Sequence, residues 1–347
     1  MHGVCFRAPH AVAWSEVADP RIEQPGDAVV AVEVAGLCGS DLHPYFGRER
    51  GLDPGTVMGH EFVGRVIDVG ADVHAVRPGD RVFAPFSTSC GRCADCARGL
   101  TSRCERGQLF GWRSGGVGLH GGQAERVRVP LADGTLKRVP DGLSADAALL
   151  LGDNFSTASY CADLAGIGPD AVTAVIGCGP VGLLGIVAAR ALGASAIVAV
   201  DPVAERRARA AALGAVAVAP GPEVGARVTA LGGRRGADCV MEFVGLPDAQ
   251  RLAWEVLRPG GVIAAIGCHS APTFAFSPSE AYDKNVTYRT GRCPARHYMD
   301  LLTPRVVAEM SDIAAVVTHR FAPQDCVRAY DVFAQHRDGC IKAVFEF

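Results

Sequence analysis

The stretch Ala171–Leu192, AVTAVIGCGPVGLLGIVAARAL, decides the fold class of this chain. A short apolar run ending at Ile176 predicts a buried strand, the pattern GxGxxG runs from Gly177 to Gly182, and an Ala- and Leu-rich segment then predicts a helix. The first glycine permits a tight turn, the second lets the backbone approach a pyrophosphate, and the third lets helix and strand pack closely. We therefore predict a doubly wound α/β sheet that binds a dinucleotide at the helix N-terminus.

An acidic residue follows the next predicted strand, Ala196–Val200. Asp201 stands nineteen residues beyond Gly182. A carboxylate at this place can accept hydrogen bonds from both ribose hydroxyls of NAD, and it would repel the 2'-phosphate of NADP. The sequence therefore favours NAD over NADP.

The alternation of helices and strands continues beyond Asp201. It predicts helices over 203–213, 223–231 and 248–257, strands over 216–219, 239–243 and 262–266, and a turn at 258–261. Because such sheets bind ligands at the carboxyl ends of their strands, the residues after two of these strands are candidate nicotinamide contacts, although small residues also end strands in general. The predicted cofactor-binding residues are Gly177, Gly179, Pro180, Val181, Gly182, Asp201, Arg206, Val244, Gly245, Ile266 and Gly267.

Length and composition indicate two domains and small-molecule partners. At 347 residues the chain exceeds the size at which single cores usually stop growing. With 49% apolar residues and a net charge of -3 it can bury a large core, and no nucleic-acid partner is expected. It shows neither an apolar stretch long enough to span a membrane nor a secretory presequence, so we expect no membrane association and a cytoplasmic location.

The first part of the chain predicts strands rather than helices. Apolar runs at 28–35 and 61–69 are separated by Pro- and Gly-containing turns, and further strands are predicted at 123–130 and 135–140. After about Gly291 the α/β alternation lapses, and a last strand at 341–347 is expected to fold back onto the first domain. The expected organisation is a β-rich domain over 1–153, a dinucleotide-binding domain over 154–290, and a return to the first domain over 291–347.

Four of the thirteen cysteines stand close together in a loop. Their spacing is C-x2-C-x2-C-x7-C, which lets one loop surround a tetrahedral metal ion. Four thiolates leave no coordination position for water, so this pattern predicts a structural zinc site rather than a catalytic one. The predicted ligands are Cys90, Cys93, Cys96 and Cys104.

A second group of metal donors is scattered along the chain. His60 and Glu61 lie between glycines, and Cys38 precedes them in the segment CGSDLH. Taken alone, Cys38 reads as a core thiol and His60 as an ordinary histidine, but together they supply the sulfur and nitrogen donors that zinc prefers. Asp153 follows an apolar run, and on local grounds a metal-ligand role and a helix N-cap role are equally plausible. His120 is interpreted as structural.

The ordered set GHE, CGSDLH, the four-cysteine loop, DNFSTA and GxGxxG resembles the zinc-dependent medium-chain dehydrogenase/reductase (alcohol dehydrogenase) family over essentially the whole chain. The resemblance implies a GroES-like β-rich catalytic domain plus a Rossmann NAD-binding domain, with two zinc ions per chain, one catalytic and one structural. It assigns Cys38, His60 and Asp153 to the catalytic zinc, with Glu61 as a nearby or alternate ligand. Many relatives carry Cys or Glu at the position of Asp153.

The resemblance also implies a proton relay and an activity. In the family a hydroxyl two residues after the first ligand and a histidine three residues further carry the proton to solvent, and Ser40 and His43 match these positions. We therefore expect an NAD-dependent zinc alcohol dehydrogenase that acts on a small alcohol or aldehyde as a homodimer or homotetramer. The alternatives are activity on formaldehyde or a polyol on the same scaffold, and a non-catalytic NAD-binding sensor.

Overall fold

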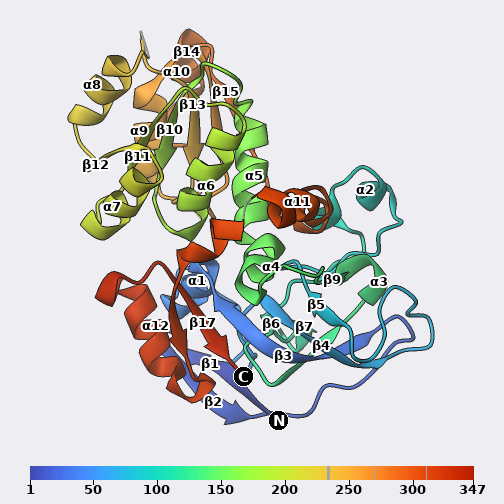
Figure 1. Cartoon of the computed structure of the whole chain (residues 1–347). Coiled ribbons are helices and arrows are strands. Elements are labelled where there is room, and N and C mark those ends of the chain that lie inside the picture. The colour runs from blue at the N-terminus through green and yellow to red at the C-terminus, as the bar shows by residue number, and fades with distance from the viewer. Residues whose placement is uncertain (233–234, 270, 310) are drawn as a thin grey trace. The chain divides into compact units, whose positions relative to one another are not determined.

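The chain divides into two compact units in a computed structural model that describes residues 1–232, 235–269, 271–309 and 311–347 (Figure 1). Unit 1 comprises Met1–Ser156 and Pro294–Phe347, and unit 2 comprises Thr157–Cys293. The first boundary falls inside helix α5 (Asn154–Ala165). Unit 1 is therefore discontinuous in sequence, with unit 2 inserted into it.

Unit 2 is built on a six-stranded parallel sheet in the order β12-β11-β10-β13-β14-β15. The strand order reverses between β10 and β13, which in such sheets marks the ligand-binding edge. The predicted doubly wound fold class is confirmed. The strands are β10 (Val172–Ile176), β11 (Ala196–Val200), β12 (Val216–Val218), β13 (Ala237–Glu242), β14 (Leu257–Ala265) and β15 (Thr287–Thr290).

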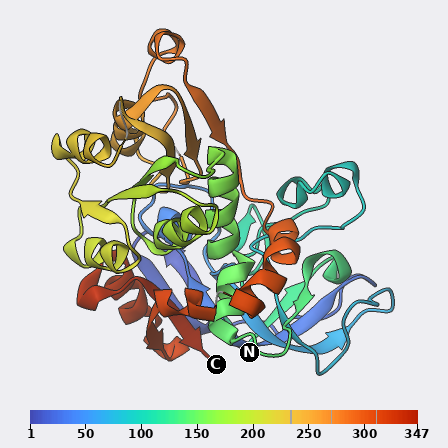
Figure 2. The same cartoon turned by 45° about the horizontal axis from the view of Figure 1, so that its top comes forward.

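Helices flank this sheet and bury its apolar strands (Figures 1 and 2). The core includes the strand residues Ile176, Val198, Val240 and Ile263, all nearly or fully buried. Continuous apolar runs suit parallel strands that are covered on both faces. The helices are α6 (Pro180–Ala191), α7 (Ala204–Ala212), α8 (Glu223–Ala230), α9 (Pro247–Val256) and α10 (Pro278–Asp283).

The turn predicted at 258–261 is wrong, because these residues lie inside β14. The pairing of β13 with β14 shifts register between Ala237 and Cys239, and the extra residues of β14 are accommodated as a bulge. Gly260 has φ +70° in this bulge, a conformation that glycine adopts at no steric cost. A Pro-Gly-Gly sequence thus marks an irregularity within a strand here.

Unit 1 is built on a mainly antiparallel sheet in the order β16-β17-β3-β4-β5-β9, with β8 also paired to β3. Strand β17, near the C-terminus, pairs antiparallel with β3 from the N-terminal part, so the end of the chain completes the first sheet. The strands are β3 (Ala28–Leu37), β4 (Phe62–Val69), β5 (Arg81–Phe83), β8 (Arg126–Val129), β9 (Lys137–Arg138), β16 (Val317–Phe321) and β17 (Lys342–Glu346).

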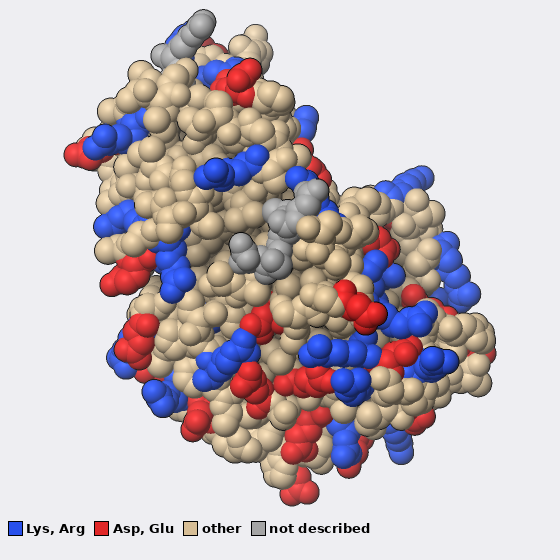
Figure 3. All heavy atoms as spheres, viewed as in Figure 1, with Lys and Arg blue, Asp and Glu red and all other residues tan. Residues whose placement is uncertain are grey.

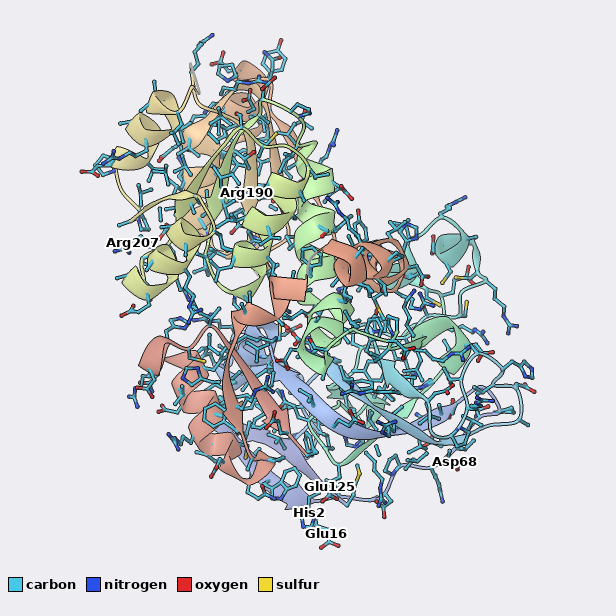
Figure 4. The ribbon with its side chains drawn as sticks, viewed as in Figure 1. His2, Glu16, Asp68, Glu125, Arg190 and Arg207 are labelled. Atoms are coloured by element: carbon cyan, nitrogen blue, oxygen red, sulfur yellow. The ribbon has the colours of Figure 1, made fainter. Side chains whose placement is uncertain are left out.

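Two hairpins and several helices complete unit 1. The hairpin β1 (His2–Ala8) with β2 (Ala11–Glu16) is tied to the segment before β8, because the backbone N–H of His2 donates to Glu125 Oε2 over 2.8 Å (Figure 4). The other elements are β6 (Trp112–Ser114), β7 (Val117–Leu119), α1 (Leu42–Tyr45), α2 (Ala94–Ala97), α3 (Ala132–Thr135), α4 (Ala145–Gly152), α11 (Ala295–Glu309) and α12 (Cys326–Ala334).

Three further features of the structure are its surface charge, the character of its helices and the state of its cysteines. Acidic and basic side chains are interspersed over the face shown in Figure 3. Among the described residues, no helix combines the length and the apolar character that crossing a membrane requires. None of the thirteen cysteines, all of which lie among the described residues, forms a disulfide.

Candidate metal centres and cofactor site

Strand pairing brings Cys38 and His60 together although twenty-one residues separate them in sequence. Cys38 follows β3 directly, and His60 and Glu61 directly precede β4. The two strands are antiparallel with Ala35 opposite Phe62, and the N–H of Gly36 donates to the carbonyl of Glu61 over 2.9 Å. The end of one strand and the start of the other therefore lie side by side.

Asp153 joins this pair from the junction of α4 and α5. It is the C-terminal cap residue of α4, and its Oδ2 lies 3.6 Å from Cys38 Sγ and 3.4 Å from His60 Nε2. Asp153 also directly precedes α5, so its position suits both the metal-ligand interpretation and the N-cap interpretation. The ligand atoms of Cys38, His60, Glu61 and Asp153 all lie within 4.8 Å of one another. One thiol, one imidazole and two carboxylates form a donor set that fits zinc.

The electrostatics of this cluster favour a bound cation. Burial raises the pKa of the Cys38 thiol, and the neighbouring carboxylates of Glu61 and Asp153 raise it further. Burial lowers the pKa of His60, but Asp41, Cys38 and Asp153 outweigh burial and raise it well above its ordinary value. A divalent cation would neutralise the acidic groups that crowd here.

Asp41 orients His60, a role that the sequence analysis missed. Its Oδ1 lies 3.3 Å from His60 Nδ1, and its Oδ2 accepts the N–H of Cys38 over 2.9 Å. A carboxylate on Nδ1 fixes the imidazole ring and leaves Nε2 for a metal. Gln123 Nε2 also donates to Asp41 Oδ2, over 3.3 Å. The sequence feature that could have indicated this role is the position of Asp41, three residues after the candidate ligand Cys38.

Glu61 is engaged by two residues that the sequence analysis also missed. Lys342 Nζ lies 2.7 Å from Oε1 and 2.5 Å from Oε2 of Glu61, and both side chains are fully buried. Asn154 Nδ2 donates to Glu61 Oε1 over 2.8 Å. Glu61 therefore lies within the donor cluster while its charge is balanced by a buried lysine. A lysine inside the last predicted strand gave no local signal of this role.

The two predicted relay residues have different surroundings. Ser40, in the short 3-10 helix Gly39–Asp41, places its Oγ 3.2 Å from His60 Nε2. His43 lies on α1 and is partly buried, and burial lowers the pKa of its imidazole. The structure thus places Ser40 at the donor cluster and His43 on the following helix, and the relay between them stays a prediction.

The four loop cysteines form a second, separate cluster in unit 1. The sulfur atoms of Cys90, Cys93, Cys96 and Cys104 lie within 4.8 Å of one another. The N–H of Cys93 points to Cys90 Sγ (3.3 Å) and that of Cys90 to Cys104 Sγ (3.2 Å). Burial raises the pKa of Cys90, but backbone N–H groups outweigh it and lower the pKa to about 6, while burial raises that of Cys96 to about 12. Four such sulfurs fit a tetrahedral zinc ion.

The glycine loop of unit 2 has the conformation that its sequence predicts. Gly177 has φ +89°, and a Cβ on Gly182 would lie 1.8 Å from the carbonyl oxygen of Gly177. A side chain at either position would therefore strain or block the loop. Helix α6 begins at Pro180 with Gly179 as its N-cap residue, so its first N–H groups are available to an anion.

Asp201 is buried next to this loop and is hydrogen-bonded to it. Its Oδ2 accepts the N–H of Cys178 and its Oδ1 accepts the N–H of Val203, each over 2.8 Å. Arg206 Nη1 lies 3.8 Å from the same carboxylate, and Arg207, on α7 (Figure 4), donates to the Asp201 carbonyl. The carboxylate therefore links the glycine loop to the segment after β11, and its role toward the ribose stays a prediction.

The remaining predicted cofactor residues lie together at the carboxyl ends of β13 and β14. A Cβ on Gly177 would meet Val244 Cγ2 at 2.6 Å, and a Cβ on Gly267 would meet the backbone nitrogen of Gly245 at 2.2 Å. The N–H of Ile266 donates to the carbonyl of Glu242 over 3.0 Å. The two loops after these strands thus touch each other, and the first of them also touches the glycine loop.

Comparison with known proteins identifies the family. Residues 24–141 match the family described as "Alcohol dehydrogenase GroES-like domain", and residues 180–306 match the family described as "Zinc-binding dehydrogenase". The chain therefore belongs to the zinc-dependent medium-chain dehydrogenases, as an oxidoreductase of the alcohol dehydrogenase type.

Individual relatives agree with this assignment. The chain is 43% identical over 292 residues to the "Medium chain reductase/dehydrogenase ucsI" of an Acremonium species, covering 82% of this chain and 98% of the relative. It is 40% identical over 308 residues to "Zinc-type alcohol dehydrogenase B" of Aspergillus flavus, covering 85% of this chain and 70% of the relative. The solved structure of alcohol dehydrogenase TADH from Thermus sp. ATN1 superposes with a TM-score of 0.92 at 38% identity, covering 100% of this chain and 99% of that one.

Proposed function

We propose that this chain is an NAD-dependent zinc alcohol dehydrogenase that interconverts an alcohol with an aldehyde or ketone by hydride transfer. The observation that carries the proposal is the convergence of Cys38, His60 and Asp153 in a single donor cluster, separate from the cysteine loop. A catalytic zinc site needs three protein donors and one open position, whereas a four-thiolate site is closed. The two clusters thus suit one catalytic and one structural zinc.

The zinc held by Cys38, His60 and Asp153 would supply Lewis acidity that lowers the pKa of a substrate hydroxyl. The residues of the chain do the remaining work. Asp41 holds the imidazole of His60 in place. Ser40 Oγ lies 3.2 Å from His60 Nε2, and in this proposal it accepts the substrate's hydroxyl proton while it donates its own proton onward. His43, whose pKa is lowered by burial, is neutral near pH 7 and is able to pass that proton on to solvent.

The NAD preference is supported by the charge at the end of β11. The Asp201 carboxylate is nearly fully buried and accepts two backbone hydrogen bonds, with Arg206 nearby, and each carboxylate oxygen has more than one acceptor site. A fixed negative charge next to the glycine loop disfavours a 2'-phosphate. We also propose a cytoplasmic location, because four of the thirteen cysteines are grouped with metal-ligand spacing rather than spread as a disulfide framework.

The proposal is tested by replacing His60 with Ala in the full-length chain. We expect NAD-linked turnover to vanish and the zinc content to fall from two ions per chain to one, because the cysteine loop keeps its ion. His74→Ala is the matched control, because it changes an exposed histidine whose backbone N–H, retained in the variant, donates to Asp133. Unchanged turnover in His60→Ala would contradict the assignment.

A panel of substrates separates this proposal from its two alternatives, a formaldehyde or polyol dehydrogenase and a non-catalytic sensor. Short primary and secondary alcohols, polyols and formaldehyde are offered with NAD and with NADP, and NADH or NADPH formation is followed by absorbance. Turnover of formaldehyde or polyols alone would shift the proposal to that branch of substrates. A chain that binds NADH yet oxidises none of these compounds would be a sensor rather than an enzyme.

A further inference from the structure

Glu242, the last residue of β13, is a fully buried carboxylate at the cofactor edge of unit 2. Its Oε1 accepts the backbone N–H groups of Val244 and Gly245, over 2.6 and 2.8 Å. A buried carboxyl group without hydrogen-bond partners is costly, so the groups that bond to it define the conformation in which its burial is tolerated. Glu242 thereby holds the backbone of Val244 and Gly245, directly after β13.

The second oxygen of this carboxylate reaches the neighbouring loop. Glu242 Oε2 lies 2.9 Å from His269 Nε2, and His269 belongs to the loop that follows β14. The His269 side chain is 20% exposed, so its ring bridges the buried acid and the surface. One carboxylate therefore holds the loops after both strands.

The backbones of the two loops approach each other closely at this point. A Cβ on Gly245 would lie 2.5 Å from the carbonyl oxygen of Cys268, and Gly245 has φ +78°. The carbonyl of Glu242 also accepts the N–H groups of Ile266 and Gly267, over 3.0 and 3.2 Å. The backbones are in direct contact, and the Glu242 side chain adds the polar link between the loops.

This link bears on the cofactor because the same loops carry four of its predicted contacts. Val244 packs against Gly177 of the glycine loop. If Gly177 carried a Cβ, that atom would lie only 2.6 Å from Val244 Cγ2. A shift of the loop after β13 would therefore move the wall of the dinucleotide site as well as the nicotinamide contacts. Preorganised loops bind a ligand more tightly, since less ordering is needed on binding.

We propose that Glu242 and His269 form a clasp that holds the loops after β13 and β14 in the conformation the nicotinamide cofactor requires. Both are positioning residues that act through Val244, Gly245 and Gly267. The clasp rests on the proposed nicotinamide-linked function, and it adds a determinant of cofactor affinity outside the glycine motif and Asp201.

The test compares His269→Ala with His269→Gln in the full-length chain. His269 is partly exposed, so neither substitution is expected to prevent folding. Loss of the bond in His269→Ala should raise the Kd of NADH about tenfold, measured by fluorescence titration, because it removes the side-chain hydrogen bond that links the two loops. His269→Gln keeps an N–H donor and should stay within about threefold of the unchanged chain. His74→Ala is the matched control and should leave the Kd unaltered.

A second readout does not depend on the cofactor. Hydrogen exchange of the cofactor-free chain should show faster exchange at the amides of Val244 and Gly245 in His269→Ala, with other amides of β13 unchanged. Unaltered Kd and exchange in His269→Ala would overturn the proposal. So would a lower thermal midpoint accompanied by uniformly faster exchange and an unaltered Kd, since that result would show a structural role alone.

The titrations are run with both NADH and NADPH to separate the two proposals. An unchanged chain that binds NADPH and not NADH overturns the NAD preference, and the clasp is then judged on the NADPH constants. Retention of NADH affinity in the unchanged chain with no effect of His269→Ala overturns the clasp and leaves the NAD preference standing.

Discussion

Lys342 Nζ lies 2.5 Å from Glu61 Oε2, and neither side chain is exposed. Burial lowers the pKa of Lys342, but the Glu61 carboxylate and Cys38 outweigh burial and raise it, so the lysine is charged. The pair lies where β17, from the C-terminal part of the chain, meets the end of β3. It therefore links the candidate metal centre to the segment that returns to unit 1.

Replacing Lys342 with Met should destabilise the chain strongly. The substitution leaves the buried Glu61 carboxylate without its cation, and breaking a buried pair in this way costs about 3–5 kcal/mol. The free energy of unfolding in urea measures the effect. Lys137→Met is the matched control, because Lys137 pairs with the exposed Asp300 at 2.6 Å and its loss should cost about 1 kcal/mol or less. Equal losses of unfolding free energy in the two variants would show that the buried pair contributes no more to stability than the exposed pair.

Cys96→Ser should release one of the two expected zinc ions. Three thiolates and a hydroxyl hold zinc less well than four thiolates, and loss of a structural metal should lower the free energy of unfolding by about 2 kcal/mol or more. Metal content per chain, measured by mass spectrometry, should fall by one. Cys268→Ser, at an exposed cysteine, should leave it unchanged. Two zinc ions in Cys96→Ser would remove the cysteine loop as a zinc site.

The fold of unit 2 was predictable because its signals are local. Each strand is a short apolar run, and the glycines from Gly177 to Gly182 have individual steric reasons. The bulge at Gly260 was not predictable, because a Pro-Gly-Gly sequence is equally typical of a turn between elements. Helix α11 was also missed, since Pro304 lies inside it and its apolar residues lack a clear helical period.

The candidate metal centre was predictable in its donors but not in its support. Cys38, His60 and Asp153 have side chains whose chemistry suggests metal binding wherever they occur together. Lys342 does not, because lysine is usually exposed and nothing in its neighbourhood indicates burial against Glu61. The clasp residue Glu242 was hidden in the same way, inside a strand that reads as apolar. Long-range charge pairing thus required the structure.

Asp201→Ala should weaken NADH binding and reduce the preference for NADH over NADPH. The substitution removes an acceptor for the ribose hydroxyls and the hydrogen bond to the N–H of Cys178, while Arg206 keeps its positive charge nearby. We expect the Kd of NADH to rise about tenfold. Fluorescence titration with both cofactors measures the ratio. Asp248→Ala, at an exposed position at the start of α9, is the control, and an unaltered ratio in Asp201→Ala would argue against the NAD preference.

His120 should make the chain less stable as the pH falls from about 6.5 to about 4. Burial, together with the positive charges of Arg113 and Arg128, lowers the pKa of His120 to about 4. Its Nδ1 accepts the N–H of Val57 over 3.0 Å, which requires the neutral ring. In this pH window the unfolded chain binds a proton that the folded chain excludes, so acidification favours unfolding.

His120→Asn should remove this part of the pH dependence. The Asn Oδ1 is able to accept the N–H of Val57 at any pH, so the variant should lose less stability than the unchanged chain between pH 7 and pH 5. Because His120 is only partly buried, the difference should be no more than about 2 kcal/mol. Urea unfolding at the two pH values measures it. The control is His74→Asn, at an exposed histidine, which should lose as much stability between pH 7 and pH 5 as the unchanged chain. If both variants lost the same stability, groups other than His120 would cause the acid sensitivity.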